Sequence, residues 1–416
     1  MTEQKKRVES LSPLREKEFR LYIGARFFYI MALRMVGTVV AYQLFQITRD
    51  SFTVGLVGLS EFVPVFVLAL YAGYKIDRSD KRTLLLKGIL SYSLCIIALI
   101  VVTGPLFTSR FNTKTLELSF YAIIFFTGVI RAFSGPTSSA ILAQLVPRSI
   151  LHLAAAISST TWLIASILGH ASAGLFIAWV GVHATFYIVL TYIFIASFLI
   201  SRISKKPIVQ HAANIKAWAS VKEGLHYVFA HKVMLAAISL DLFAVLFGGA
   251  VALLPEFANE ILSVGPKGFG FLNAAIDIGS GSMLLFTTFF PLRKKQGTIL
   301  LFAVAGFGIC IISLGLSGVY WIAFVSLLIA GMLDGISVVI RSTVLQLTTP
   351  DEMRGRVSSV NSMFVNSSNE LGQFESGFTA RLLGGARPAI LFGGVLTLIV
   401  VIITWIKAPG LRKFEY

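Results

Sequence analysis

Long apolar segments repeat along most of this chain and limit what it can fold into. Between Leu21 and Ile406 they recur with about 18 or more residues each, enough to cross a bilayer as an α-helix. Charged residues make up 13% of the 416 residues, whereas soluble domains carry about 25%. The sequence therefore predicts a membrane protein with many spans and excludes a soluble globular enzyme.

Hydropathy and helix-breaking residues predict twelve helical spans. We place them at 19–48, 53–76, 83–104, 117–146, 151–179, 182–201, 233–257, 267–290, 298–316, 319–349, 356–383 and 387–406. The longest polar break, 202–232, divides the spans six and six. The expected organisation is a tail (1–18), a first half (19–201), a linker (202–232), a second half (233–406) and a second tail (407–416).

Basic residues are distributed unevenly between the two sides of these spans. If the N-terminal tail is inside, 26 of the 36 Lys and Arg residues lie in inner segments and six lie in outer segments. Cytoplasmic loops carry such an excess of Lys and Arg, so both termini are predicted to be cytoplasmic. The net charge of +16 then reflects membrane orientation, and no nucleic-acid partner is expected.

The linker contains a segment with helical amphipathic spacing. Its apolar residues are Ile215, Trp218, Leu225, Val228 and Phe229, and they lie opposite Lys216, Lys222 and Glu223. This pattern predicts a helix at the membrane interface. A solvated linker is the alternative.

The two halves show weak internal repetition. A shift of 203 residues superposes Gly128 on Gly331 and Ser134 on Ser337, and it sets Arg131 opposite Asp334. Parallel repeats of this kind are typical of secondary transporters.

A tight charged loop follows the second span. It contains Gly73, Asp77, Arg78, Lys81 and Arg82, and it resembles the signature between helices 2 and 3 of the major facilitator superfamily. The resemblance implies a conformational latch against the other half. Asp80 stands where the family usually has Gly, and the alternative is a loop that only sets orientation.

Two further stretches extend the resemblance over essentially the whole chain. Arg131 with Gly135 is similar to the fourth span of proton-coupled exporters of the superfamily, and residues 350–377 look like the branch of siderophore and drug exporters that contains the bacterial enterobactin exporter. The resemblance implies an all-α major facilitator fold with two pseudo-symmetric six-helix halves, located in the bacterial inner membrane and working by alternating access.

Charged residues inside spans are the candidates for a substrate and proton pathway, because such residues are costly in lipid and normally serve function. These candidates are Arg34, Glu61, Arg131, Asp241, Asp334, Arg341 and Glu370. Asp334 and Arg341 are two helical turns apart, about 10 Å. This separation is too long for an ion pair, so each should find a partner on another helix. The intramembrane His170 is interpreted as a hydrogen-bonded packing residue.

The sequence contains no phosphate-binding loop of the GxxxxGK[ST] type and no Cys or His cluster with metal-ligand spacing. No cofactor is therefore expected, and a proton gradient is the expected energy source. We expect a monomer that exports a small organic molecule such as a siderophore in exchange for protons. A multidrug exporter for lipophilic cations is the alternative, and a membrane receptor or enzyme is the alternative from another class.

Overall fold

The computed structural model describes residues 11–207, 217–290, 292 and 294–415, and it is almost entirely helical. The long helices are α2 (Lys17–Thr48), α3 (Ser51–Asp77), α4 (Lys81–Thr103), α6 (Thr113–Leu142), α7 (Leu151–Ser201), α8 (Ala217–Ala230), α9 (Lys232–Gly248), α11 (Gly265–Phe289), α12 (Gln296–Leu316), α13 (Tyr320–Thr348), α14 (Arg354–Leu383) and α15 (Ala386–Lys407). Short turns connect them, among them α5 (Pro105–Thr108), η3 (Ala250–Leu253), α10 (Leu254–Glu256) and η4 (Phe257–Ile261).

These helices confirm the predicted twelve-span fold. Ten helical segments of the described chain are long and apolar enough to cross a membrane. One of them contains α7, which carries two spans, because Gly181 breaks the helix with φ 80° and ψ 169°. The twelfth span is α14, whose 30 residues are long enough to cross but unusually polar. A polar helix at membrane depth must turn its polar side to protein or water.

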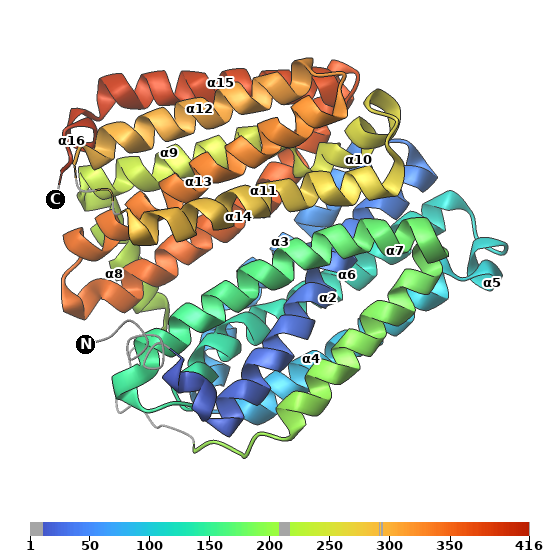
Figure 1. Cartoon of the computed structure of the whole chain (residues 1–416), viewed down its shortest axis with the longest axis horizontal. Coiled ribbons are helices and arrows are strands. Elements are labelled where there is room, and N and C mark those ends of the chain that lie inside the picture. Colours follow the sequence, from blue (N-terminus) through green and yellow to red (C-terminus); the bar gives the residue numbers. More distant parts are fainter. Residues whose placement is uncertain (1–10, 208–216, 291, 293, 416) are drawn as a thin grey trace. The chain divides into compact units, whose positions relative to one another are not determined.

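The chain forms two compact units. In Figure 1 one is coloured blue to green, and the other yellow-green to red except for its segment 41–62, which is blue. Unit 1 comprises residues 1–40 and 63–214, and unit 2 comprises 41–62 and 215–416, so far as these are described. The tip that joins α2 to α3, residues 41–62, thus packs with the C-terminal helices. We call this segment the hairpin tip. The sequence assigned the hairpin tip to the first half (19–201), whereas in the structure it belongs to unit 2.

Unit 1 is held together by aromatic and hydroxyl contacts between α2 and α6. The Tyr22 hydroxyl donates to the Ser138 carbonyl at 2.8 Å, and the Tyr29 and Ser134 hydroxyls lie 3.0 Å apart. The ring of Tyr29 meets that of Tyr92 on α4 edge-on at 5.8 Å. Such buried polar contacts fix the register of helices that apolar packing alone would leave free to slide.

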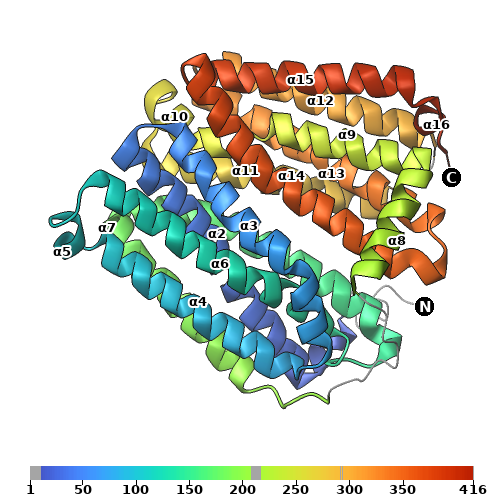
Figure 2. The same cartoon turned by 180° about the vertical axis from the view of Figure 1, so that it is seen from behind.

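Unit 2 packs α11 against α13 through glycines. A Cβ atom on Gly331 would lie 2.1 Å from the Ile276 carbonyl oxygen, and one on Gly279 would lie 2.0 Å from that of Leu328. The two backbones therefore approach as closely as small residues permit. Helices α9, α12 and α15 complete this layer, as both views show (Figures 1 and 2).

The seventh span is broken, whereas the sequence predicted a continuous helix over 233–257. Helix α9 ends at Gly248, and η3, α10 and η4 continue the span in irregular turns. Gly249 leaves the helical region with ψ 77°, and the Ser376 hydroxyl donates to its carbonyl at 2.9 Å. A side chain on α14 thus satisfies backbone that the break would otherwise leave bare at membrane depth.

Helix α8 lies within the predicted linker and docks on unit 2. Arg356 Nη1 contacts Glu223 Oε1 at 2.5 Å, and the Tyr227 hydroxyl donates to the Thr348 carbonyl at 2.7 Å. Val228 is fully buried among protein side chains, while Phe229 is half exposed. The apolar side of α8 therefore packs partly against protein, and its position at the membrane interface stays a prediction. The linker residues Ile215 and Lys216 lie outside the described residues.

Candidate functional site

A buried ion pair joins α9 to α13 inside unit 2. Arg341 on α13 donates to the carboxylate of Asp241 on α9, and the two residues are 6% and 5% exposed. Arg341 Nε also donates to the Ser337 hydroxyl at 3.1 Å. Arg341 therefore finds its partner on another helix, as its distance from Asp334 along α13 predicted.

A small pocket opens beside this pair. Asp241, Asp334 and Ser337 supply its polar wall, and Phe307 and Leu333 are among its apolar lining residues. Asp334 lies one helical turn before Ser337 on α13, and Arg341 lies one turn after it, so these three residues form one stripe along the helix. The structure thus gathers three predicted pathway residues, Asp241, Asp334 and Arg341, at one place in unit 2.

The charges at this place do not balance. Asp241 interacts electrostatically with Arg341 and Asp334, and Asp334 interacts with Arg341 and with Asp277 on α11. Two carboxylates, Asp241 and Asp334, therefore share the one guanidinium group of Arg341. An unpaired charge at the centre of a span costs at least about 2.5 kcal/mol, so a cluster of this composition favours binding a cation or a proton.

The pathway arginines of unit 1 lie on other helices. Arg34 on α2 is half-buried, and its guanidinium carbon lies 5.0 Å from the centre of the Trp162 ring on α7. The backbone comes close here, because a Cβ on Gly169 would lie 2.7 Å from Arg34 Cβ. Arg131 is half-buried on α6. His170 bonds Thr38 through Nδ1 at 2.7 Å, as the packing interpretation expects.

Glu61 and Glu370 belong to α3 and α14 of unit 2. Both are half-buried, and Gln373 Nε2 donates to Glu370 Oε2 at 3.1 Å. The backbones of the two helices nearly touch, since a Cβ on Gly58 would lie 2.6 Å from the Glu370 carbonyl oxygen. These two acids therefore flank a close helix contact and are not among the residues that line the pocket.

The charged loop uses its bases within unit 1. Lys81 is buried and donates to the Asp77 and Ser79 carbonyls, both at 3.3 Å, which caps the end of α3. Arg82 donates to the carbonyls of Ser201 and Ile203, where α7 ends. The remaining motif residues, Gly73, Asp77 and Arg78, are exposed. The latch role of this motif against the other half stays a prediction.

Asp80, which departs from the family pattern, has a definite role in this loop. It is the N-cap of α4, accepting from the Thr83 backbone N–H at 3.3 Å, and it also accepts from the Lys206 backbone N–H at 2.9 Å. Partial burial favours a higher pKa of Asp80, but the hydrogen bonds from Thr83, Lys206 and Arg82 outweigh it and lower this pKa below its ordinary value.

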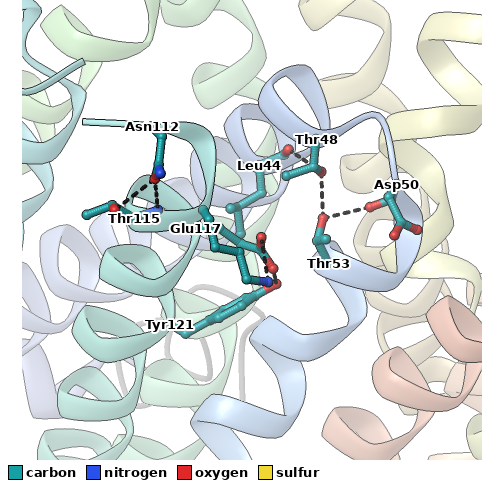
Figure 3. A network of polar contacts seen from close by, with 9 residues as sticks. Leu44, Thr48, Asp50, Thr53, Asn112, Thr115, Glu117 and Tyr121 are labelled. Atoms are coloured by element: carbon teal, nitrogen blue, oxygen red, sulfur yellow. Dashed lines mark hydrogen bonds and ion pairs between the residues drawn. The ribbon is translucent and has the colours of Figure 1, made fainter. Parts of the chain in front are cut away.

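Sequence reasoning missed two acids. Glu117 near the start of α6 is 7% exposed and accepts from the Tyr121 hydroxyl at 3.0 Å (Figure 3). Glu256 in α10 accepts from Ser51 and from the Ala386 backbone. Both lie near the ends of predicted spans, where an acid is easily interpreted as a loop residue. Their closeness in sequence to the apolar runs was the one feature that could have indicated burial.

Comparisons with known proteins bear on the family and the fold of the chain. The sequence profile of the Major Facilitator Superfamily matches residues 22–373. The chain is 24% identical over 379 residues to the uncharacterized MFS-type transporter YfiS of Bacillus subtilis, covering 87% of this chain and 86% of that protein. It is 24% identical over 403 residues to the enterobactin exporter EntS of Escherichia coli O1:K1, covering 95% and 93%.

Solved structures share the fold at low identity. The nucleoside transporter NupG has a TM-score of 0.77 with 12% identity, covering 94% of this chain and all of that one. A D-xylose–proton symporter has a TM-score of 0.74 with 14% identity, covering 97% and 100%. With the twelve spans and the profile match over most of its length, the chain belongs to the Major Facilitator Superfamily of transporters.

Proposed function

We propose that this transporter exports a small organic anion, such as a siderophore, in exchange for protons that enter the cell. The buried cluster of Asp241, Asp334 and Arg341 carries the proposal. Its excess of carboxylates gives it a place to bind a proton within a membrane span. The likeness to the enterobactin exporter over 95% of the chain supports the substrate class.

The distribution of charge between the units supports an anionic substrate. The spans of unit 1 carry three arginines, Arg26, Arg34 and Arg131, and their buried acid Glu117 pairs with Lys114 at 3.3 Å. The spans of unit 2 carry mostly acids, which are Glu61, Asp241, Asp277, Asp334, Glu370 and Glu375, against the one buried Arg341. Unit 1 would then hold the anion and unit 2 would hold the proton.

In this mechanism Asp334 binds and releases the proton, and Arg341 responds to the change in the charge of Asp334. Arg341 bonds both Asp241 and Ser337, and Ser337 lies one turn from Asp334 on the same helix. Protonation of Asp334 removes one negative charge near Arg341, which strengthens the pair with Asp241. A ligand shifts a conformational equilibrium only through such differential contacts.

The test uses inverted membrane vesicles that contain the protein in their membrane. In these vesicles export appears as uptake of a labelled catecholate. Uptake should need an imposed proton gradient. Asp334→Asn should abolish gradient-driven uptake while substrate exchange without a gradient persists. Glu375→Gln is the matched control, because Glu375 is a half-buried acid of α14 that accepts from Thr379 at 2.8 Å. If Asp334→Asn impairs exchange equally and lowers thermal stability, Asp334 is a structural brace.

A second candidate function is export of lipophilic cations, which the excess of acids in unit 2 favours. Cells lacking the chain would then release siderophore normally and become sensitive to lipophilic cations. Retention of siderophore by those cells, with unchanged sensitivity to cations, is the outcome that the anion proposal requires.

A further inference from the structure

The hairpin tip is docked on unit 2 through glycine contacts. A Cβ on Gly55 would lie 2.8 Å from the Gln373 carbonyl oxygen, and one on Gly377 would lie 2.7 Å from that of Ser51. The centres of the Phe52 and Phe374 rings lie 6.0 Å apart, and the Arg381 guanidinium carbon lies 5.0 Å from the centre of the Phe52 ring. The backbones therefore pack closely, and a gap of about 0.5–1 Å would already forfeit roughly a quarter to a half of their dispersion attraction.

The tip is also rigid in itself. The Thr48 hydroxyl donates to the Leu44 carbonyl at 2.8 Å, and the hydroxyls of Thr48 and Thr53 lie 2.6 Å apart (Figure 3). The Thr53 hydroxyl donates to the Asp50 carbonyl at 2.7 Å. Arg49 turns the chain with φ 52°. The tip can therefore dock or leave as one piece.

The carboxylate of Glu256 also joins this piece to the rest of unit 2. Glu256 Oε2 accepts from the Ser51 hydroxyl at 2.5 Å, and Oε1 accepts from the Ala386 backbone N–H at 2.7 Å, where α15 begins. Ser51 is 2% exposed. Both bonds are strongest when Glu256 is ionised, because the carboxylate charge strengthens them and the N-terminus of α15 favours a negative charge.

The charged groups on the elements around Glu256 are directed elsewhere. Arg49 lies over Phe45, Arg381 over Phe52, and Arg387 donates to the Ser317 carbonyl at 3.1 Å. Asp50 accepts from the Phe52 backbone N–H at 2.9 Å. Glu260 on η4 and Lys267 on α11 are exposed. The Ser51 bond therefore depends chiefly on the charge of Glu256 itself.

We propose that Glu256 is a proton-binding site that controls docking of the hairpin tip. In the ionised state it holds Ser51 and the tip stays docked. When it takes a proton from the outer side, the carboxylate becomes a neutral acid, both accepted bonds weaken, and the tip is released. This inference rests on the proposed proton coupling and on the predicted orientation, in which the tip is at the outer end of the spans.

The experiment measures access from outside to a buried position of the hairpin tip. In a chain with Cys95→Ala and Cys310→Ala, Val54→Cys places a thiol at a position that is 2% exposed when the tip is docked. Leu106→Cys, at a position 77% exposed in α5, is labelled in a parallel sample to correct for the effect of pH on thiol chemistry. An impermeant maleimide is added to sealed cells at a series of external pH values.

Labelling of Val54→Cys relative to Leu106→Cys should rise about tenfold as external pH falls, the change expected when a charge-assisted hydrogen bond is lost. Glu256→Gln and Ser51→Ala should each give high labelling that no longer varies with pH. Glu260→Gln, an exposed acid one turn away, should behave like the parent chain.

The outcome that overturns the inference is pH-dependent labelling that survives in Glu256→Gln. If Glu256 only caps α15, Glu256→Gln lowers thermal stability while Ser51→Ala labels like the parent, and this also overturns it. Failure of proton-driven uptake in the vesicle assay would instead contradict the proposed function, so the two failures are distinguishable.

Discussion

At the scale of single residues, the buried pair of Asp241 and Arg341 should contribute to stability mainly because each partner neutralises the other. Arg341→Met leaves Asp241 as an unpaired buried acid, which typically costs about 3–5 kcal/mol. The double variant Asp241→Asn with Arg341→Met should recover most of this loss. Thermal unfolding of the purified protein in detergent measures both.

The control for this pair is Glu223→Gln. It breaks the ion pair with Arg356, in which the Glu223 side chain is 54% exposed, and exposed pairs contribute about 0–1 kcal/mol. Equal losses for Arg341→Met and for the double variant would show that packing of the Arg341 side chain, not charge, is the main contribution.

Asp80 should give the charged loop a stability that depends on pH. Its pKa is lowered in the folded protein, so its contribution is fully present above the unfolded pKa of about 3.9 and is lost as pH falls through the folded value. Asp80→Ala should cost about 1 kcal/mol at neutral pH through loss of the N-cap. The difference in thermal midpoint between wild type and Asp80→Ala should shrink toward acid pH.

The exposed Asp77 provides the comparison for Asp80. Asp77→Ala should leave the thermal midpoint nearly unchanged at every pH, because surface substitutions away from caps and buried contacts usually change stability by no more than about 0.5 kcal/mol. A midpoint difference for Asp80→Ala that stays constant with pH would mean that the cap acts through conformation alone.

The sequence predicted parts of this site and not others. It indicated that Arg341 needs a partner on another helix, because intramembrane charge is costly and Asp334 is two turns away. It could not identify Asp241 as that partner, since 100 residues separate the two and only the packing of α9 on α13 brings them together. Glu256 was missed for the same reason, because its partners Ser51 and Ala386 are distant in sequence.

At the scale of helices, the seam between α11 and α13 should be intolerant of any added side chain. Gly331→Ala or Gly279→Ala places a methyl group about 2 Å from a carbonyl oxygen of the facing helix. Overpacking of this kind typically lowers the free energy of unfolding by about 1–3 kcal/mol. Both variants should lower the thermal midpoint and the yield of folded protein.

Gly135→Ala in α6 is the control for the seam. Among the described residues nothing lies within 4 Å of a Cβ at Gly135, and Ala favours a helix over Gly by about 1 kcal/mol. Stability should therefore stay equal or rise. A loss at Gly135 as large as that at Gly331 would show that the cost comes from replacing Gly in a span and not from the seam.

The helices also show which signals a sequence carries. The break at Gly181 was predicted, because this glycine, with His183 close by, lies between two apolar runs. The break at Gly249 was not predicted, although Gly248, Gly249 and Pro255 stand in one span. Those residues are tolerated in continuous membrane helices too, and only the Ser376 bond to the Gly249 carbonyl distinguishes the broken form.

At the scale of the whole molecule, charge is divided between the two compact units. The arginines within the spans of unit 1 and the acids within those of unit 2 would allow one substrate charge and one proton to be bound by different units. In this arrangement each ligand biases the position of its own unit. Exchange of anion and proton then needs no direct contact between the two ligands, only a conformational equilibrium that both of them shift.

The orientation of the molecule is the last prediction. Because 26 of the 36 basic residues lie in the segments assigned to the inside, the positive-inside rule places both termini in the cytoplasm. In sealed cells, Lys114→Cys and Lys267→Cys should react with an impermeant maleimide, because both positions lie in outer segments and are exposed. Lys205→Cys and Lys222→Cys, which are exposed on inner segments, should react only after the membrane is opened. Reaction of Lys222→Cys in sealed cells would invert the topology, and with it the side from which Glu256 receives its proton.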